Sequence, residues 1–434
     1  MGIPALEHVA SVPEGRDPCA ALSPVLLAHR PARTARLGLP MRRRAMQPEE
    51  VRTVPVAGEQ SVRTSGLLTA SRRVLDPVGL ALVLLVVAWW WYLLAVQGSA
   101  GDWAFDFRQF WQGAKDVVDG VSPYPGRALL ETAGAQLDPA GIQHVFRFPY
   151  PAGAAIFLAP LGLLGFHAAA AIWSVILIAS LLGAVWILGV RDWRVLAIVV
   201  SSAPVLTSVR LGSFTPILLL LLAIAWRWRD RPWVAGGSLA LAIALKVFVW
   251  PLVVWLAVTR RYAAAGIAAA GAAVVTLGAW TAIGFRGLSE YPELVRRLTS
   301  VVEGRGYSLV ALGLQLDLPH GVARALPWLV GLALLGWAAV AARRGTDERA
   351  TFSVAVVAAV ALTPIVWLHY FALLVVPLAL ARPRLSWAWA LLWVFWLFPD
   401  QVNEGEVWRL LLALALAGIV LVQAARVPGR KAAV

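Results

Sequence analysis

The stretch WRWRDRPWVAGGSLALAIALKVFVWPLVVWLAVTRRY, residues 226–262, decides how this chain folds. Its apolar centre, residues 234–258, is long enough to cross a bilayer, but arginines flank it on both sides. Because arginine-rich loops stay in the cytoplasm, a single crossing cannot satisfy both flanks. We therefore expect two half-helices that turn within residues 246–251. Such irregular backbone is tolerated at membrane depth only where protein or a water-filled cavity covers it.

The composition is that of a polytopic membrane protein. Of the 434 residues, 60% are hydrophobic and 14% charged, and the mean hydropathy is +0.73, whereas ordinary soluble domains are roughly 45–50% apolar. Apolar windows approach the ~20 residues of a membrane helix from residue 74 onward. Besides 234–258, the expected segments are 74–96, 150–165, 168–189, 196–209, 215–226, 263–283, 322–342, 352–367, 370–381, 387–398 and 407–425. We predict an all-α bundle of about 11–13 transmembrane or re-entrant helices.

The positive charge of the chain points to the membrane rather than to nucleic acid. The net charge is +14 and the pI is near 11.0, but the arginines fall in short clusters between apolar runs. This distribution is typical of cytoplasmic loops, so no nucleic-acid partner is expected. The single cysteine, Cys19, excludes an intrachain disulfide and a cysteine metal cluster.

Three parts are expected. Residues 1–73 form a disordered basic arm, for which Met41 and Met46 are alternative starts, residues 74–425 form the membrane domain, and residues 426–434 form a basic tail. Because Arg72 and Arg73 precede the first apolar run, both termini are placed in the cytoplasm of a cell-membrane protein. The loops expected outside are 97–148, 284–306, 363–369 and 398–406; those expected inside are 191–194, 343–349 and 382–384. Residues 150–189 must then make one net crossing, and we expect 150–165 to be partly re-entrant.

The first outer loop contains the charged stretch DFRQFWQGAKDVVDGVSPYP, residues 106–125. Its apolar residues recur at helical spacing, so we expect an interfacial helix with aromatic side chains toward lipid. The apolar face comprises Phe107, Phe110, Trp111, Ala114, Val117, Val118 and Val121. The opposite face, with Asp106, Gln109, Gly113 and Asp116, is expected toward water or a cavity.

Asp106 permits two interpretations. Asp followed three residues later by Gln109 is a capping-box pattern, and Asp is a preferred N-cap. The second interpretation is a catalytic carboxylate at the mouth of a membrane cavity, where a low dielectric raises its basicity toward that of a useful general base. The two roles are compatible, since a cap would hold the base in place.

Two further polar residues lie in apolar surroundings. Lys246, in LALAIALKVFVWP, lies far from the cytoplasmic headgroups if the chain turns there, so its ammonium needs an anion such as a phosphate. His369, in ALTPIVWLHYF, is either a structural residue of an aromatic belt or a site residue. His144 and His320 are weaker candidates.

The sequence shows no HExxH, CxxC or DxD pattern and no Gly-rich phosphate loop. We therefore expect no metal, no cofactor and no nucleotide-linked substrate. Arg108, Arg147 and Arg210 could clamp a phosphate through paired hydrogen bonds, although arginines near an interface also serve as simple headgroup contacts.

With these residues in view, the chain resembles glycosyltransferase family 87, polyprenyl-phosphate-mannose-dependent mannosyltransferases of the GT-C membrane fold. The resemblance extends over residues 74–425 and rests on four segments in order: residues 106–125, FRFPYPAGAAIFLAPLGLL at 146–164, residues 210–262, and LTPIVWLHYFALLVVPLAL at 362–380. The chain departs from the family pattern at Gly212-Ser-Phe-Thr and at His369-Tyr370.

The resemblance implies a site on the extracytoplasmic face. Asp106 corresponds to the general base, His369 to a histidine of the catalytic site, and Lys246 to a ligand of the lipid phosphate. Arg108 and Arg210 are expected to join Lys246 at the donor phosphate, and the outer-loop cavity is expected to be lined by Gln109, Tyr124, Arg147 and Tyr150. The implied reaction is a metal-independent inverting displacement.

In that reaction a mannosyl residue passes from a polyprenyl-phosphate donor to a glycolipid or glycan acceptor, with membrane lipids as the surroundings. Two alternatives stay open. One is a lipid-linked arabinosyl- or glucosyltransferase. The other is a transporter or lipid flippase, because re-entrant half-helices and an embedded lysine also mark substrate paths.

Overall fold

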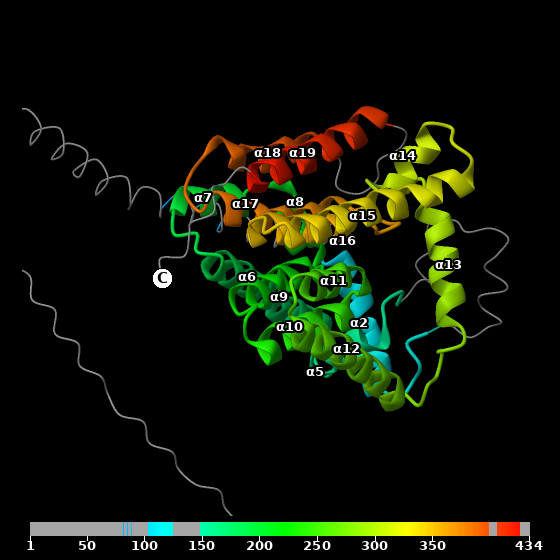
Figure 1. Ribbon diagram of the computed structural model, residues 1–434. Coiled ribbons are helices and arrows are strands. Elements are labelled where there is room, and N and C mark those ends of the chain that lie inside the picture. The colour runs from blue at the N-terminus through cyan, green and yellow to red at the C-terminus, as the bar shows by residue number, and fades with distance from the viewer. Residues whose placement is uncertain are drawn as a thin grey trace, which may run out of the picture. The chain divides into compact units, whose positions relative to one another are not determined.

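The computed structural model describes residues 103–124, 148–398 and 406–425, together with Ala81, Leu85 and Ala88. Within these ranges every regular element is helical, which confirms the predicted all-α class. The expected basic arm, most of the first span, Arg147 and the basic tail lie outside the described residues. The long elements are α2 (Phe105–Val118), α5 (Ala152–Gly162), α6 (Phe166–Ile187), α7 (Trp193–Val200), α8 (Ala203–Leu211), α9 (Thr215–Arg227), α10 (Pro232–Leu245), α11 (Pro251–Val258), α12 (Tyr262–Ala282), α13 (Tyr291–Val302), α14 (Leu309–Gln315), α15 (His320–Arg343), α16 (Glu348–Ala361), α17 (Val375–Ala381) and α19 (Val407–Ala425); the short ones are η1 (Val247–Val249), η2 (Leu368–Leu374), η3 (Trp387–Ala390), α18 (Leu391–Val394) and η4 (Phe395–Leu397) (Figure 1).

Four of the described helices, α6, α12, α15 and α19, are long and apolar enough to cross a membrane, and six shorter apolar helices accompany them. The pair α7 and α8 makes a fifth candidate span, bent by 59°. One continuous helix was expected over residues 196–209, but Pro204 in the first turn of α8 lacks the N–H needed to continue α7. The chain is therefore a multi-pass membrane protein.

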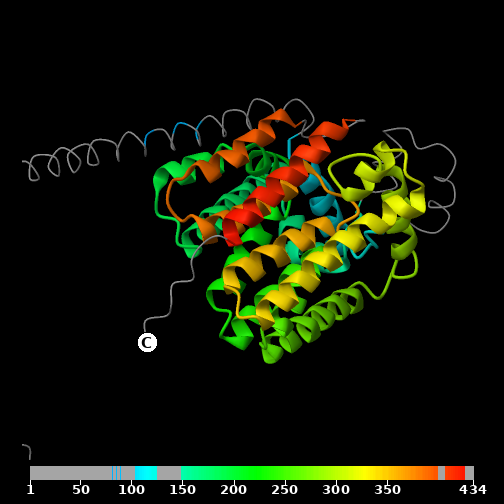
Figure 2. The same cartoon turned by 45° about the horizontal axis from the view of Figure 1, so that its top comes forward.

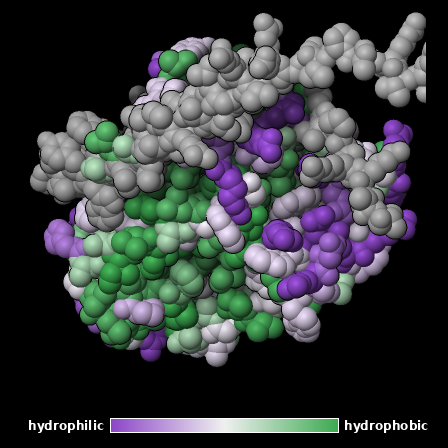
Figure 3. All heavy atoms as spheres, turned by 90° about the vertical axis from the view of Figure 1, so that its left-hand side faces the viewer, coloured by the Kyte–Doolittle hydropathy of each residue, from purple (hydrophilic) through white to green (hydrophobic). Residues whose placement is uncertain are grey.

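The exterior agrees with this conclusion. Figure 3 shows one face of the molecule on which hydrophobic residues cover a broad area and hydrophilic residues gather to one side of it. Large apolar side chains are exposed along the candidate spans, for example Trp328, Leu329 and Leu332 on α15. Exposure of this kind suits contact with lipid, which imposes no penalty on apolar surface.

The segment from α10 to α11 turns back on itself, as the flanking arginines predict. Gly236 of α10 packs against Ala264 and Ile267 of α12, and further along Gly271 packs against Ala240, so α10 and α12 run in the same direction. Because α12 begins four residues after α11 ends, α11 must return to the end where α10 began. The turn is at Lys246, whose extended backbone (φ −147°, ψ 110°) separates α10 from η1.

Ion pairs join the loops at the starting end of α10. Arg261 donates to Asp230 at 2.7 Å and to Glu348 at 2.8 Å, and Arg229 donates to Glu348 at 2.7 Å. Elsewhere the N–H of Leu385 donates to Asp192 at 3.1 Å. Each contact joins loops for which the positive-inside rule predicts the same side.

Helix α5 enters and leaves beside one part of α2. Phe148, just before α5, fills the space beside Gly113, and Gly162 at the end of α5 lies against the backbone of Ala114 and Lys115. The chain thus leaves α2 and returns to it within this short helix; the partly re-entrant course of residues 150–165 stays a prediction.

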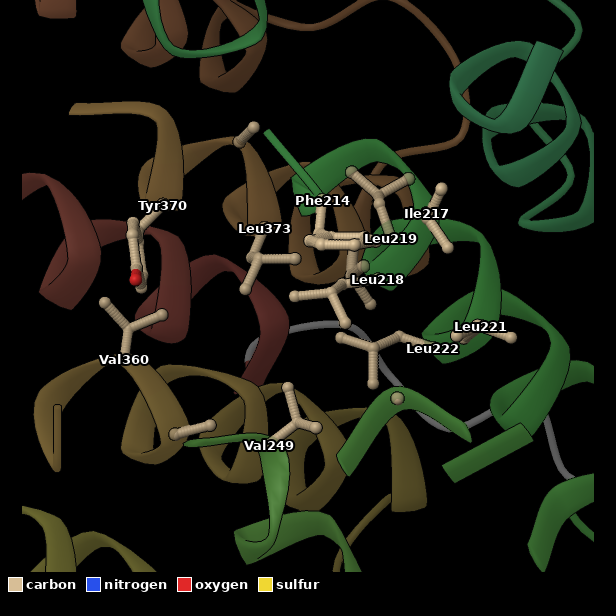
Figure 4. Close-up of a cluster of buried hydrophobic side chains, with 14 of the residues drawn as sticks. Phe214, Ile217, Leu218, Leu219, Leu221, Leu222, Val249, Val360, Tyr370 and Leu373 are labelled. Atoms are coloured by element: carbon tan, nitrogen blue, oxygen red, sulfur yellow. The ribbon is translucent and has the colours of Figure 1, made fainter. Parts of the chain in front are cut away.

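Helices α15 and α16 form a hairpin and lie side by side, and α19 lies alongside α16 (Figure 2). Between α16, α9 and η2 lies a cluster of buried apolar side chains (Figure 4). Leu373 of η2 lies between Tyr370 and the pair formed by Phe214, the N-cap of α9, and Leu218 of α9. Val360 of α16 lies beside Tyr370. This packing fixes η2, which carries two polar residues of the candidate site.

Two helices in the described residues were not expected from the sequence. Residues 284–306 were predicted only as an outer loop, but they include the amphipathic helix α13, and α14 follows. Tyr291, at the start of α13, packs edge-on against Tyr124 and Trp280. The start of α13 is therefore anchored to the end of α12.

Candidate functional site

Helix α2 places Asp106 in its first turn rather than at its cap. The helix begins at Phe105, and Ala104 occupies the N-cap position without a side-chain hydrogen bond. The capping-box interpretation of Asp106 and Gln109 is therefore wrong, because the helix begins before Asp106 and leaves another residue at the N-cap. Ala104 adopts a left-handed conformation (φ 56°), and its N–H donates to the carbonyl of Arg210 at 2.8 Å. This backbone bond ties the start of α2 to the end of α8.

The aromatic face of α2 packs on protein, which corrects the expectation that it faces lipid. Phe107 is fully buried and stacks on Trp173 with ring centroids 5.7 Å apart. Phe110 is also fully buried, and its ring centroid lies 4.5 Å from that of Phe214. The spacing predicted which face is apolar, but α5, α6 and α9 cover that face. These contacts hold the helix that carries Asp106, which is one turn before Phe110.

Asp106 and His369 meet across 263 residues of sequence. The Oδ2 atom of Asp106 lies 4.0 Å from Nε2 of His369. His369 is 2% exposed, and neither of its ring nitrogens has a hydrogen-bond partner. Since an unsatisfied buried polar group costs about 1–3 kcal/mol, these nitrogens are the kind of groups that a ligand or water would satisfy.

Lys246 reaches the same region from the turn after α10. Its Nζ donates to the hydroxyl of Tyr370 at 3.1 Å, and it lies 4.5 Å from the ring centroid of Tyr370 and 5.6 Å from that of Tyr150. Lys246 is 7% exposed. In the described part of the chain no carboxylate forms an ion pair with it. The amino group of Lys246 therefore lies in a nearly buried position lined by aromatic rings.

The carboxylate of Asp106 has a perturbed pKa. Burial raises its pKa to about 6, and the positive charge of Lys246 acts in the opposite direction. The Asp106 side chain nevertheless remains 14% exposed. A carboxyl group of this kind ionises near neutral pH and can accept a proton there, as a general base must.

The other predicted site residues are distributed around this cluster. Tyr150 packs edge-on against Phe110 at 4.4 Å, and the hydroxyl of Tyr124 donates to the carbonyl of Tyr150 at 2.8 Å. Gln109 is partly buried on α2. These three residues therefore lie on or beside the elements that hold Asp106.

Of the predicted arginines, Arg108 and Arg210 lie in the described part of the chain. Arg108 is exposed and places its guanidinium 4.4 Å over the ring of Phe166. Arg210 contributes its backbone carbonyl to the contact with Ala104. Arg147 and His144 lie outside the described residues, and His320 lies 3.4 Å from Glu303, remote in sequence from the cluster.

Tyr370 is the residue that sequence reasoning missed. It was noted only as a departure from a family pattern, and nothing in the sequence shows that its hydroxyl meets Lys246, 124 residues away. The available signal was its position next to His369. Across the described residues, no group of three His, Cys, Asp or Glu side chains is placed to hold a metal ion.

Comparison with known proteins gives one match. The sequence profile of glycosyltransferase family 87 matches residues 148–366, about half of the chain. The matched region contains Tyr150 and Lys246, while Asp106 lies before it and His369 just after it. No curated protein and no solved structure gave a match.

Proposed function

The chain belongs to glycosyltransferase family 87, and from this premise we propose that it moves a mannosyl residue from a polyprenyl-phosphate donor to a glycolipid or glycan acceptor at the extracytoplasmic face. As a membrane glycosyltransferase it binds a sugar donor and an acceptor. The observation that carries the finer proposal is the meeting of Asp106, His369 and Lys246 from three distant segments. A base and a nearby cation that forms no ion pair within the described residues suit attack by a hydroxyl and departure of a phosphate.

In the proposed reaction Asp106 accepts the proton of the acceptor hydroxyl. The oxygen of that hydroxyl attacks the anomeric carbon as the bond from this carbon to the phosphate oxygen breaks, which inverts the configuration. The leaving phosphate departs beside the ammonium of Lys246. His369, next to Asp106, is proposed to hydrogen-bond the reacting groups through its unpartnered ring nitrogens.

The proposed sidedness follows from the ends of the helices. Lys246 lies at the end of α10 opposite to Asp230, about 21 Å away for 14 helical residues. His369 likewise follows the end of α16 opposite to Glu348. If the basic loops that pair with Asp230 and Glu348 are cytoplasmic, both site residues lie toward the other face. The proposed location is the cell membrane, with both termini in the cytoplasm.

The test is transfer of labelled mannose from polyprenyl-phosphate mannose into extractable glycolipid by membranes that contain the protein. Asp106→Asn keeps the size of the side chain but removes the base, so we expect at least a ~100-fold loss of transfer. The matched control is Asp119→Asn, which removes an exposed carboxylate of the same segment that pairs with Lys115 at 3.1 Å. An exposed pair contributes about 0–1 kcal/mol, so this variant should transfer as wild type.

The other outcomes are equally informative. Equal activity of Asp106→Asn and wild type would remove the proposed base. Transfer of arabinose or glucose, but not mannose, from the corresponding lipid phosphates would change the sugar while retaining the site. Movement of the lipid across the membrane without transfer to any acceptor would instead support the flippase alternative.

A further inference from the structure

We propose that Tyr370 is a second hydrogen-bond donor to the phosphate of the lipid donor and acts together with Lys246. The inference rests on the proposed function in one respect, namely that the donor carries a phosphate. It adds a ligand-binding residue that lies outside the region matched by the family profile, residues 148–366.

The direction of the bond between Lys246 and Tyr370 leaves a proton available. An ammonium group can only donate, so in the 3.1 Å contact Nζ donates and the phenol oxygen accepts. The hydroxyl proton of Tyr370 is then free to be donated to another acceptor. Within the described residues the hydroxyl makes no other hydrogen bond. Two donors this close together can reach two oxygens of one phosphate group, as paired donors do in bidentate recognition.

The charge around Lys246 favours an anion at this place. Several other cations in the described part of the chain pair with carboxylates: Lys115 pairs with Asp119, and Arg261 pairs with Asp230 and Glu348. Within the described residues Lys246 forms no ion pair: the hydroxyl of Tyr370 and two aromatic rings contact it, and the Asp106 carboxylate acts on it only through space. Because a buried charge without a directly paired counterion is unfavourable, the site gains from an anionic ligand that contacts the ammonium.

Tyr370 is held in place by its neighbours. Its ring lies 5.1 Å from the ring of Phe248 and 4.9 Å from the ring of His369. The residue is 8% exposed and lies within η2, whose residues are all buried. A phenol that is fixed before the ligand arrives loses little conformational freedom on binding, so the entropic cost of binding the phosphate is small.

Binding of a lipid phosphate that carries no sugar tests the role of Tyr370 separately from the proposed sugar transfer. The probe is a polyprenyl monophosphate, compared with the corresponding polyprenol, bound to the purified full chain in detergent. Tyr370→Phe keeps the ring and removes only the hydroxyl. Because Tyr370→Phe loses a hydrogen bond to a charged group, we expect it to bind the polyprenyl monophosphate at least about 10-fold more weakly than wild type does. Binding of the polyprenol should be unchanged.

The control is Tyr307→Phe, which removes a hydroxyl from another buried tyrosine. The ring of Tyr307 packs on Phe371, the neighbour of Tyr370, and on Phe398. We expect this variant to bind the phosphate as wild type does. Thermal unfolding of both variants, measured in parallel, identifies any loss that comes from a weakened fold.

Kinetics supply the second readout. With limiting donor, Tyr370→Phe should raise KM for the donor while KM for the acceptor stays unchanged, which a general weakening of the fold would not produce. If the folded variant keeps the wild-type preference for phosphate over polyprenol, Tyr370 is not a phosphate ligand and the inference fails alone. If wild type itself shows no such preference, the proposed donor class fails with it.

Discussion

Asp230 and Arg261 stand 31 residues apart in the chain, yet hydrogen bonds of 2.7 and 3.1 Å join them. They lie just before α10 and just before α12, so the intervening α10, η1 and α11 start and finish at one end of the bundle. This contact explains how an apolar stretch flanked by arginines on both sides can be accommodated. It also places Lys246, at the far turn of this segment, away from the charged loops.

The first prediction concerns sidedness. In a background with Cys19→Ser, Arg231→Cys and Arg260→Cys should react with a membrane-impermeant thiol reagent only after the membrane is opened, since both exposed positions flank the hairpin. Ser289→Cys, in the outer loop, should react in intact cells. Labelling of residues 231 and 260 from opposite sides would contradict the hairpin.

The second prediction uses two adjacent glycines of α10. A Cβ at Gly236 would lie 2.7 Å from the carbonyl oxygen of Ala264, whereas a Cβ at Gly237 would meet nothing within 4 Å. Gly236→Ala should therefore lower the free energy of unfolding by roughly 1–3 kcal/mol through overpacking. Gly237→Ala should be neutral or stabilise the helix by up to about 1 kcal/mol. Thermal unfolding in detergent checks the order, and the reverse order would argue against parallel packing of α10 on α12.

The third prediction is the pH dependence of transfer. Burial raises the pKa of Asp106 to about 6, and a general base acts only when it is ionised. Transfer at limiting donor should be half-maximal near pH 6 and about tenfold lower near pH 5, with recovery when the sample is returned to pH 7.5. A profile that stays flat down to pH 4.5 would show that Asp106 does not limit the reaction.

The fourth prediction concerns stability. The folded-state pKa of Asp106, about 6, lies above its ordinary value of 3.8, so the folded state holds the proton more tightly than the unfolded chain. The contribution of this group therefore becomes less favourable as the pH rises from about 4 to about 6. At ~1.4 kcal/mol per pKa unit, the folded protein is destabilised by about 3 kcal/mol at pH 7.

Asp106→Asn removes this ionisation and should unfold at a higher temperature than wild type at pH 7.5. The difference between the two proteins should shrink as the pH is lowered to about 4. A variant that is less stable than wild type at pH 7.5 would indicate that the carboxylate contributes contacts which offset its desolvation. Asp119→Asn, which removes an exposed acid of the same segment, should show little change at either pH.

The sequence predicted those helices whose hydrophobic or charge pattern lies within one continuous stretch of residues. Helix α19 has the expected bounds, residues 407–425, because a long apolar run between polar flanks forms a span wherever it is placed. The hairpin at Lys246 was also predictable, since the charge of its two flanks restricts which side they occupy. The amphipathic helix α13 was missed because it lies in a loop that was assigned only by its charge and length.

The sequence by itself determined that this chain is a helical membrane protein with Asp106, Lys246 and His369 as its unusual polar residues, because burying a charged or polar group in an apolar run is costly enough to be conspicuous. Only the tertiary structure decided that protein rather than lipid covers Phe107 and Phe110, since periodicity identifies an apolar face but not its partner. It likewise decided that Tyr370 meets Lys246. A hydrogen bond depends on a separation of a few ångströms, and residues 124 positions apart acquire that separation only through the packing of α10 and η2 in the folded chain.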